Sequence, residues 1–134
     1  MATFGSEWWS ITPPPGWRVQ DDDECATFSN PDGTSALQIS SARKDAGSVT
    51  ANDLREFAAP ELPPTVNLDP VVMGVFDGLH ASFSKDHFHW DRWWLRNASL
   101  IIYVTYNCPE HEAGLEDSAV RRALQTLEPK RGAA

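Results

Sequence analysis

Alternating apolar and polar positions along the chain predict a series of short β-strands. Strands are expected at Trp8–Ile11, Trp17–Gln20, Cys25–Asn30, Thr34–Ser41, Val71–Phe76, Leu79–Lys85, His87–Arg96 and Leu100–Asn107. Asn30-Pro31-Asp32-Gly33 carries turn residues between two of these strands. Asp77-Gly78 is the strongest hairpin signal, because a type I′ turn needs positive φ at both central residues.

Helical periodicity is confined to two segments. In the first, Thr50 is a suitable N-cap residue, with Asp53 three positions later in an imperfect capping box. An apolar stripe at helical spacing follows, made of Leu54, Phe57 and Ala58. Pro60 disfavours helical angles at Ala59, so the helix is expected to end there.

The second helix is predicted over Leu115–Leu127, near the end of the chain. Its apolar residues recur at a spacing of about four, namely Leu115, Ala119, Val120, Ala123, Leu124 and Leu127. The residues after it, 129–134, are expected to form a frayed tail. The chain therefore reads as one domain over residues 1–134, with its core at about 7–128.

The residue pattern of the last two predicted strands indicates how the sheet is covered. Leu100–Val104 is apolar at both odd and even positions, and both parities of Phe88–Leu95 carry aromatic residues. A sheet with one wet face would alternate cleanly, so both faces of this sheet need cover. The pattern predicts an α+β fold with a central antiparallel sheet, covered by helices on both sides or by a dimer partner on one.

Several segments together resemble a known group of proteins. They are Pro14–Trp17, Phe28–Gly33, Leu37–Ser41, Trp93-Trp94, Ile101–Cys108 and Val120–Leu127. From about Trp8 to Leu127 they are similar to the small bacterial members of the Mog1/PsbP-like group. The resemblance implies an α/β/α sandwich with a central antiparallel sheet and two main helices. It also implies a non-catalytic role, because members include a regulator of a small GTPase, an accessory subunit of photosystem II, and chaperones or immunity proteins linked to toxin secretion.

Composition narrows the classes of partner and the compartment. The net charge of −8 disfavours nucleic acid and anionic membrane surfaces, which both attract Lys and Arg. The first residues lack the basic and apolar regions of a signal peptide, and no segment is apolar enough to span a membrane, so a cytoplasmic location is expected. Cys25 and Cys108 belong to no CxxC pair and are expected to be reduced thiols, with a single disulfide as the alternative.

The strand containing Trp90, Arg92, Trp94 and Arg96 is the candidate partner-binding surface. These four side chains share one strand face, and Trp and Arg are the residues most enriched at binding hot spots. The alternative is that the two tryptophans pack under a helix while the arginines reach solvent.

The opposite face of the same strand offers a candidate metal site. His87, His89 and Asp91 alternate along it, and two imidazoles with one carboxylate are a known ligand set for zinc or iron. The alternative is a polar strip that Trp93 and Leu95 continue toward the core.

The sequence contains no G-x-S-x-G elbow, P-loop or G-x-G-x-x-G motif, and we expect neither catalytic residues nor a cofactor. The leading interpretation is a non-enzymatic protein-binding module, serving as an immunity, chaperone or accessory protein for a toxin or effector. Its binding face would be the Trp/Arg strand face or the acidic loops, including Asp21–Glu24, which otherwise form a solvated turn. A metal-binding protein and a homodimeric structural domain are the two alternatives.

Overall fold

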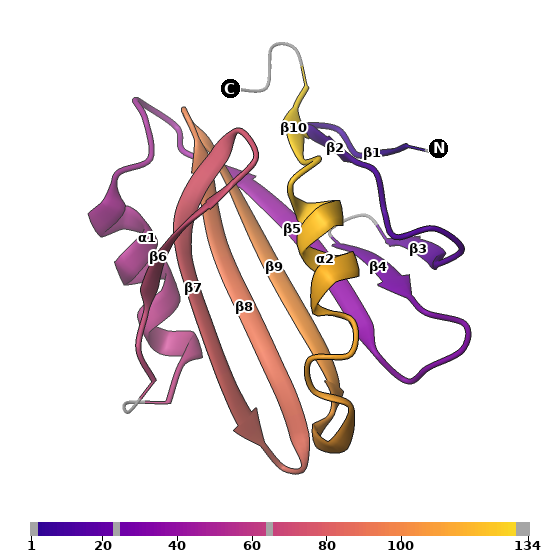
Figure 1. Ribbon diagram of the computed structural model, residues 1–134. Coiled ribbons are helices and arrows are strands. Elements are labelled where there is room, and N and C mark those ends of the chain that lie inside the picture. Colours follow the sequence, from indigo (N-terminus) through magenta and orange to yellow (C-terminus); the bar gives the residue numbers. More distant parts are fainter. Residues whose placement is uncertain (1–2, 23–24, 64–65, 131–134) are drawn as a thin grey trace.

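The computed structural model describes residues 3–22, 25–63 and 66–130, and within them the chain forms two antiparallel sheets and two α-helices. Seven strands make the main sheet (Figure 1), in the spatial order β3 (Arg18–Asp22), β4 (Cys25–Ser29), β5 (Ala36–Arg43), β9 (Leu100–Pro109), β8 (Phe88–Asn97), β7 (Phe76–Lys85) and β6 (Asp69–Met73). The small sheet consists of β1 (Phe4–Gly5), β2 (Trp9–Ile11) and β10 (Glu128–Pro129).

The helices lie on opposite faces of the main sheet (Figure 1). The first is α1 (Ala51–Ala58), which a 3₁₀ turn, η1 (Ala59–Glu61), continues; the second is α2 (Asp117–Leu124), which follows the 3₁₀ turn η2 (Glu110–Glu112). None of the helices in the described residues is long and apolar enough to cross a membrane. An α+β fold built on an antiparallel sheet is thereby confirmed.

Each sheet face has its own hydrophobic core, because successive residues of a strand point to opposite sides. Along β9, Leu100, Ile102 and Val104 pack with α2 and the small sheet, while Ile101 and Tyr103 pack with α1. The continuous apolar run in this strand is therefore explained by cover on both faces.

Helix α1 begins as its sequence predicts. The Thr50 hydroxyl accepts a hydrogen bond from the Asp53 backbone N–H at 3.0 Å, and the Asp53 carboxylate accepts one from the Thr50 N–H at 2.9 Å. Leu54 and Ala58 are buried, but Phe57 is 46% exposed and lies at the rim of the stripe. The α-helix ends where Pro60 predicts, with Ala59 as its C-cap, and the chain continues from there into the 3₁₀ turn η1.

The hairpin predicted at Asp77-Gly78 lies elsewhere. The turn is formed by Gly74 and Val75, with Met73 paired to Phe76, and Asp77-Gly78 lies inside β7. Gly74 has a φ of 64°, and positive φ at only the first central residue is the type II′ pattern. Met73 and Phe76 are both buried in the core beneath α2, so this register keeps two large side chains on the same buried face.

The C-terminal region also differs from its prediction. Helix α2 begins at Asp117, and Leu115 lies before it with 76% of its surface exposed. After the helix, Leu127 is buried, and Pro129 pairs with Trp9 in β10. Residue 129 therefore does not belong to a frayed tail, and residues 131–134 lie outside the described part of the chain.

Candidate functional site

The four residues of the Trp/Arg strand face separate into two pairs. Trp94 is fully buried beneath α1, with its ring stacked on Tyr103 at 5.6 Å between centroids. Arg96 donates to the Asp77 carboxylate at 3.1 Å and to the Val49 carbonyl at 3.1 Å. Trp94 is therefore part of the core, whereas Arg96 is half-buried and engaged in contacts within the protein.

Trp90 and Arg92 instead line an open groove beside η1. The Arg92 guanidinium carbon lies 5.3 Å from the Phe83 ring centroid and 5.2 Å from the Trp90 ring centroid, in cation–π contact with both. Phe83 on β7 is the direct cross-strand partner of Trp90 on β8, which explains why the two rings meet. Phe88 is 40% exposed at the start of β8 and adds a third ring to the groove.

We call this cavity the aromatic groove, with a volume of about 650 Å³. Its lining consists of Pro60, Leu62, Pro63, Phe83, Lys85, Asp86, Phe88, Trp90 and Arg92. The sequence interpretation missed Phe83, Phe88 and the proline-rich wall. The β7–β8 hairpin pattern could have brought in Phe83, whereas no local pattern places Pro60–Pro63 against β8.

The proposed metal residues are only partly brought together. His87 lies in the β7–β8 turn with a φ of 69°, next to Asp86 with a φ of 55°, so it does not share the strand face of His89 and Asp91. Positive φ at both positions makes this a type I′ turn, and the strand begins only at Phe88. The expected ligand set of His87, His89 and Asp91 is therefore not assembled.

His80 from β7 takes the third position. The Nε2 atoms of His80 and His89 lie 2.8 and 2.9 Å from the two oxygens of the Asp91 carboxylate. The His80 ring also stacks on Trp93 at 4.9 Å. Asp91 is 7% exposed, and the cluster forms one wall of a cavity of about 430 Å³ that Arg121 on α2 faces.

The pKa of Asp91 reflects opposing effects. Burial raises the pKa, but the hydrogen bonds and charges of His80 and His89 outweigh burial and leave the pKa below its ordinary value. An ionised carboxylate between two Nε2 atoms accepts hydrogen bonds from both, which orients the two rings. Among the described residues, no group of three or more His, Cys, Asp or Glu side chains is arranged to hold a metal ion.

Replacing Asp91 with Asn should lower the free energy of unfolding at pH 7 by about 2–3 kcal/mol, because charge-assisted hydrogen bonds to both His80 and His89 are weakened. Since the folded-state pKa is lowered, this stabilisation is present above the unfolded pKa of about 4 and is lost as the pH falls through the folded value. Urea titrations of both proteins from pH 7 to pH 3 should show the difference in the free energy of unfolding becoming smaller.

Asp77→Asn, which breaks an exposed pair with Arg96, is the control and should cost less than about 1 kcal/mol. An equal loss in both variants would contradict the structural role of the cluster.

The thiols do not have the character of nucleophiles. Burial raises the pKa of Cys25 and of Cys108, which keeps each thiol protonated. Both cysteines are free, so the alternative of a Cys25–Cys108 disulfide is wrong in this structure. Beside Cys108, Tyr106 donates to the Glu116 carboxylate at 2.6 Å; burial, then this contact, raises the Tyr106 pKa.

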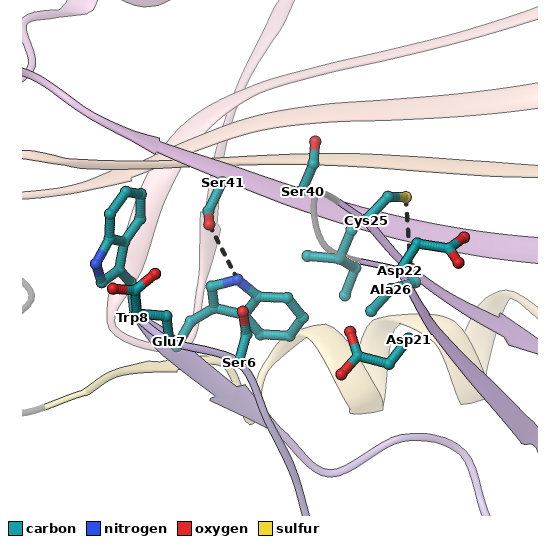
Figure 2. A pocket seen from close by; sticks show the side chains of 11 residues that line it. Ser6, Glu7, Trp8, Asp21, Asp22, Cys25, Ala26, Ser40 and Ser41 are labelled. Carbon is teal, nitrogen blue, oxygen red and sulfur yellow. Dashed lines mark hydrogen bonds between the residues drawn. The ribbon is translucent and has the colours of Figure 1, made fainter.

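A third cavity lies between the small sheet and strands β3–β5 (Figure 2). Its volume is about 430 Å³, and we call it the acidic pocket because Glu7, Asp21 and Asp22 line it together with Trp8. At its floor the Trp9 Nε1 donates to the Ser41 hydroxyl at 3.2 Å. The acidic run expected to be a solvated turn is thus partly strand: Asp21 and Asp22 end β3, and Asp23 and Glu24 lie outside the described residues.

Comparison with known proteins identifies the fold and no family. No family model and no curated protein matches the chain. A crystal structure from Bacteroides thetaiotaomicron VPI-5482 is similar with a TM-score of 0.73 and 19% identity over 98% of this chain, which spans 49% of that protein. LpqN, involved in cell envelope biogenesis of Mycobacterium tuberculosis, is similar with a TM-score of 0.60 and 14% identity over 91% of this chain and 83% of its own. At these identities the likeness concerns the fold alone.

Proposed function

We propose that this chain is a non-enzymatic, cytoplasmic protein-binding domain of the Mog1/PsbP-like kind and that the aromatic groove is its docking site. The observation that carries the proposal is that the Arg92 guanidinium is in cation–π contact with both Phe83 and Trp90 along an open cavity. Aromatic and Arg side chains in a partly desolvated pocket are typical of the centre of a protein interface.

The lining of the aromatic groove supports a particular kind of partner segment. Among the described residues, three aromatic rings line it, those of Phe83, Phe88 and Trp90, together with Leu62 and two prolines. A segment that carries an apolar side chain complements these rings. By the resemblance of the sequence, we propose that this segment belongs to a toxin or effector protein that the domain chaperones or neutralises.

The test is crosslinking from inside the aromatic groove in the native host. A photoreactive phenylalanine analogue replaces Phe88, and a matched control carries it at Val72, which is 73% exposed on β6. We expect one partner to be crosslinked from position 88 and not from position 72. With that partner purified, Trp90→Ala should weaken the Kd at least tenfold, or about 1.4 kcal/mol, while Val72→Ala leaves it unchanged.

Two outcomes would contradict the proposal. Equal crosslinking from both positions would mean that the aromatic groove is not the docking site. A product of twice the mass of this chain would assign the groove to a second copy and favour the homodimer interpretation.

A further inference from the structure

Strand β3 forms one edge of the main sheet and differs from the other edge in being able to accept a further strand. It pairs only with β4 among the described residues, and all five of its residues are exposed (Figure 1). The opposite edge, β6, contains Pro70, which lacks a backbone N–H and hinders the addition of a strand. β3 contains no proline, so its outward-facing backbone groups are available for pairing.

The residues of β3 are complementary to a second copy of themselves. The strand begins with Arg18 and ends with Asp22, and Gln20 is its middle residue. When two copies pair antiparallel about Gln20, Arg18 of each copy lies directly opposite Asp22 of the other. Opposite charges in directly opposed positions stabilise an antiparallel pair. Asp21 lies opposite Val19 in this register, so no two carboxylates are directly opposed.

Backbone geometry leaves few other registers for such a pair. Residues with outward-facing N–H and C=O groups alternate along an edge strand, so a symmetric antiparallel pair must be centred on a residue and not between two residues. Centring the pair on Asp21 would oppose two carboxylates. Centring it on Val19 would leave Asp22 without Arg18 as its partner. The register about Gln20 is therefore the one that pairs all five residues and both sets of opposite charges.

We propose that the β3 edge binds a second copy of this chain. The two β3 strands pair antiparallel about Gln20, the two main sheets become one continuous sheet, and each Arg18 forms a salt bridge with Asp22 of the other copy. A pair of five-residue strands is a small interface, so the dimer forms at micromolar or higher concentration.

This dimer leaves the rest of the surface as it is in the single chain. The two faces of the main sheet are already covered by α1 and α2, and the second copy adds only at the edge (Figure 1). The aromatic groove lies on β7 and β8, toward the opposite edge of the sheet. Both grooves therefore stay open in the dimer, and the inference stands or fails independently of the proposed function.

The first test measures the mass of the protein by sedimentation equilibrium from about 10 μM to about 1 mM, the range in which a small interface associates. We expect the mass to rise from that of one chain toward that of two. Arg18→Asp and Asp22→Arg each place like charges opposite each other at two positions of the dimer, so each should weaken the association about tenfold.

A mixture of the two variants tests the register. The Arg18→Asp chain has carboxylates at both positions and the Asp22→Arg chain has guanidinium groups at both, so a mixed pair restores both opposite charges. Both variants keep a negative net charge, so overall charge does not draw them together. We expect the mixture to associate as tightly as the wild type. Asp45→Arg makes the same change in net charge at an exposed position outside the strands and should alter the association less than about twofold.

A disulfide crosslink locates the symmetry axis of the dimer. Gln20 lies opposite Gln20 of the other copy, and directly opposed residues of antiparallel strands are close enough for a disulfide. Gln20→Cys should therefore give a crosslinked dimer under mild oxidation. Val72→Cys, on the opposite edge strand and 73% exposed, should not, and neither should the wild type with its free Cys25 and Cys108.

Three results would overturn the proposal. They are a wild-type protein with the mass of one chain at every concentration, charge-swapped variants that associate no more tightly when mixed than alone, and equal crosslinking of Gln20→Cys and Val72→Cys.

Discussion

Replacing Trp94 with Ala should lower the free energy of unfolding by about 3–5 kcal/mol, the cost typical of removing a large aromatic side chain from a core. Trp94 is fully buried, packs beneath α1 and stacks on Tyr103. Its indole N–H is buried with no hydrogen-bond acceptor among the described residues. Trp94→Phe keeps a ring in the core and removes that unpaired donor, so it should cost much less than the alanine variant. Urea unfolding followed by circular dichroism measures both losses.

Trp90→Ala is the matched control for the Trp94 variant. Trp90 lies on the same strand face but remains partly exposed in the aromatic groove, so its removal should cost clearly less stability. If Trp94→Ala were the milder of the two, the assignment of Trp94 to the core and of Trp90 to the surface would be wrong.

Gly78→Ala should destabilise the protein by about 3 kcal/mol, although it adds only one methyl group. A Cβ at Gly78 would collide with the Trp94 carbonyl oxygen and lie 2.9 Å from the Leu95 Cα, both on the neighbouring strand β8. These are backbone atoms, so relief requires the two strands to move apart, which is the overpacking that costs most. Thermal unfolding should show a correspondingly lower Tm.

Gly33→Ala provides the comparison, because it makes the same chemical change where space exists. The nearest atom to a Cβ there is the Asn30 Cβ, at 3.9 Å, and no positive φ needs a glycine. We expect a change within about 0.5 kcal/mol of the wild-type value. If Gly78→Ala were as mild, the close approach of β7 and β8 at this position would not be a constraint on the sheet.

Much of the local structure could be predicted because its causes lie within a few residues. The Thr50–Asp53 capping box is a contact over three residues, and Asn30–Gly33 closes its own turn through an Asn30 carbonyl to Gly33 N–H bond of 3.1 Å. The two-sided cover of Leu100–Val104 follows from its apolar run alone, since any exposed face would have demanded polar residues.

The Asp77-Gly78 turn was predicted from the same kind of local preference and was wrong. That turn would have paired Phe76 directly with Leu79 and placed both side chains on one face of the sheet. In the fold, Phe76 belongs to the core beneath α2 and Leu79 to the core beneath α1. Burial of both outweighs the turn preference, and the chain turns at Gly74 instead.

The candidate sites were also predicted only as far as they depend on a single strand. The alternation of β8 was enough to place His89 and Asp91 on one face and Trp90 and Arg92 on the other. It could not supply His80, which reaches Asp91 only through the register of β7 against β8, or distinguish Trp90 from Trp94, because only the position of α1 buries the second ring.

The sequence by itself determined both helices, most strands of the main sheet, the need to cover both sheet faces and the acidic character of the surface, because each depends on the identity of residues close together in the chain. Only the tertiary structure decided which glycine forms the hairpin turn, which tryptophan is buried, which histidine joins Asp91 and that β3 lies at one edge of the main sheet. Those features depend on the register and order of strands, which are selected by the combined burial of side chains that lie far apart in the sequence.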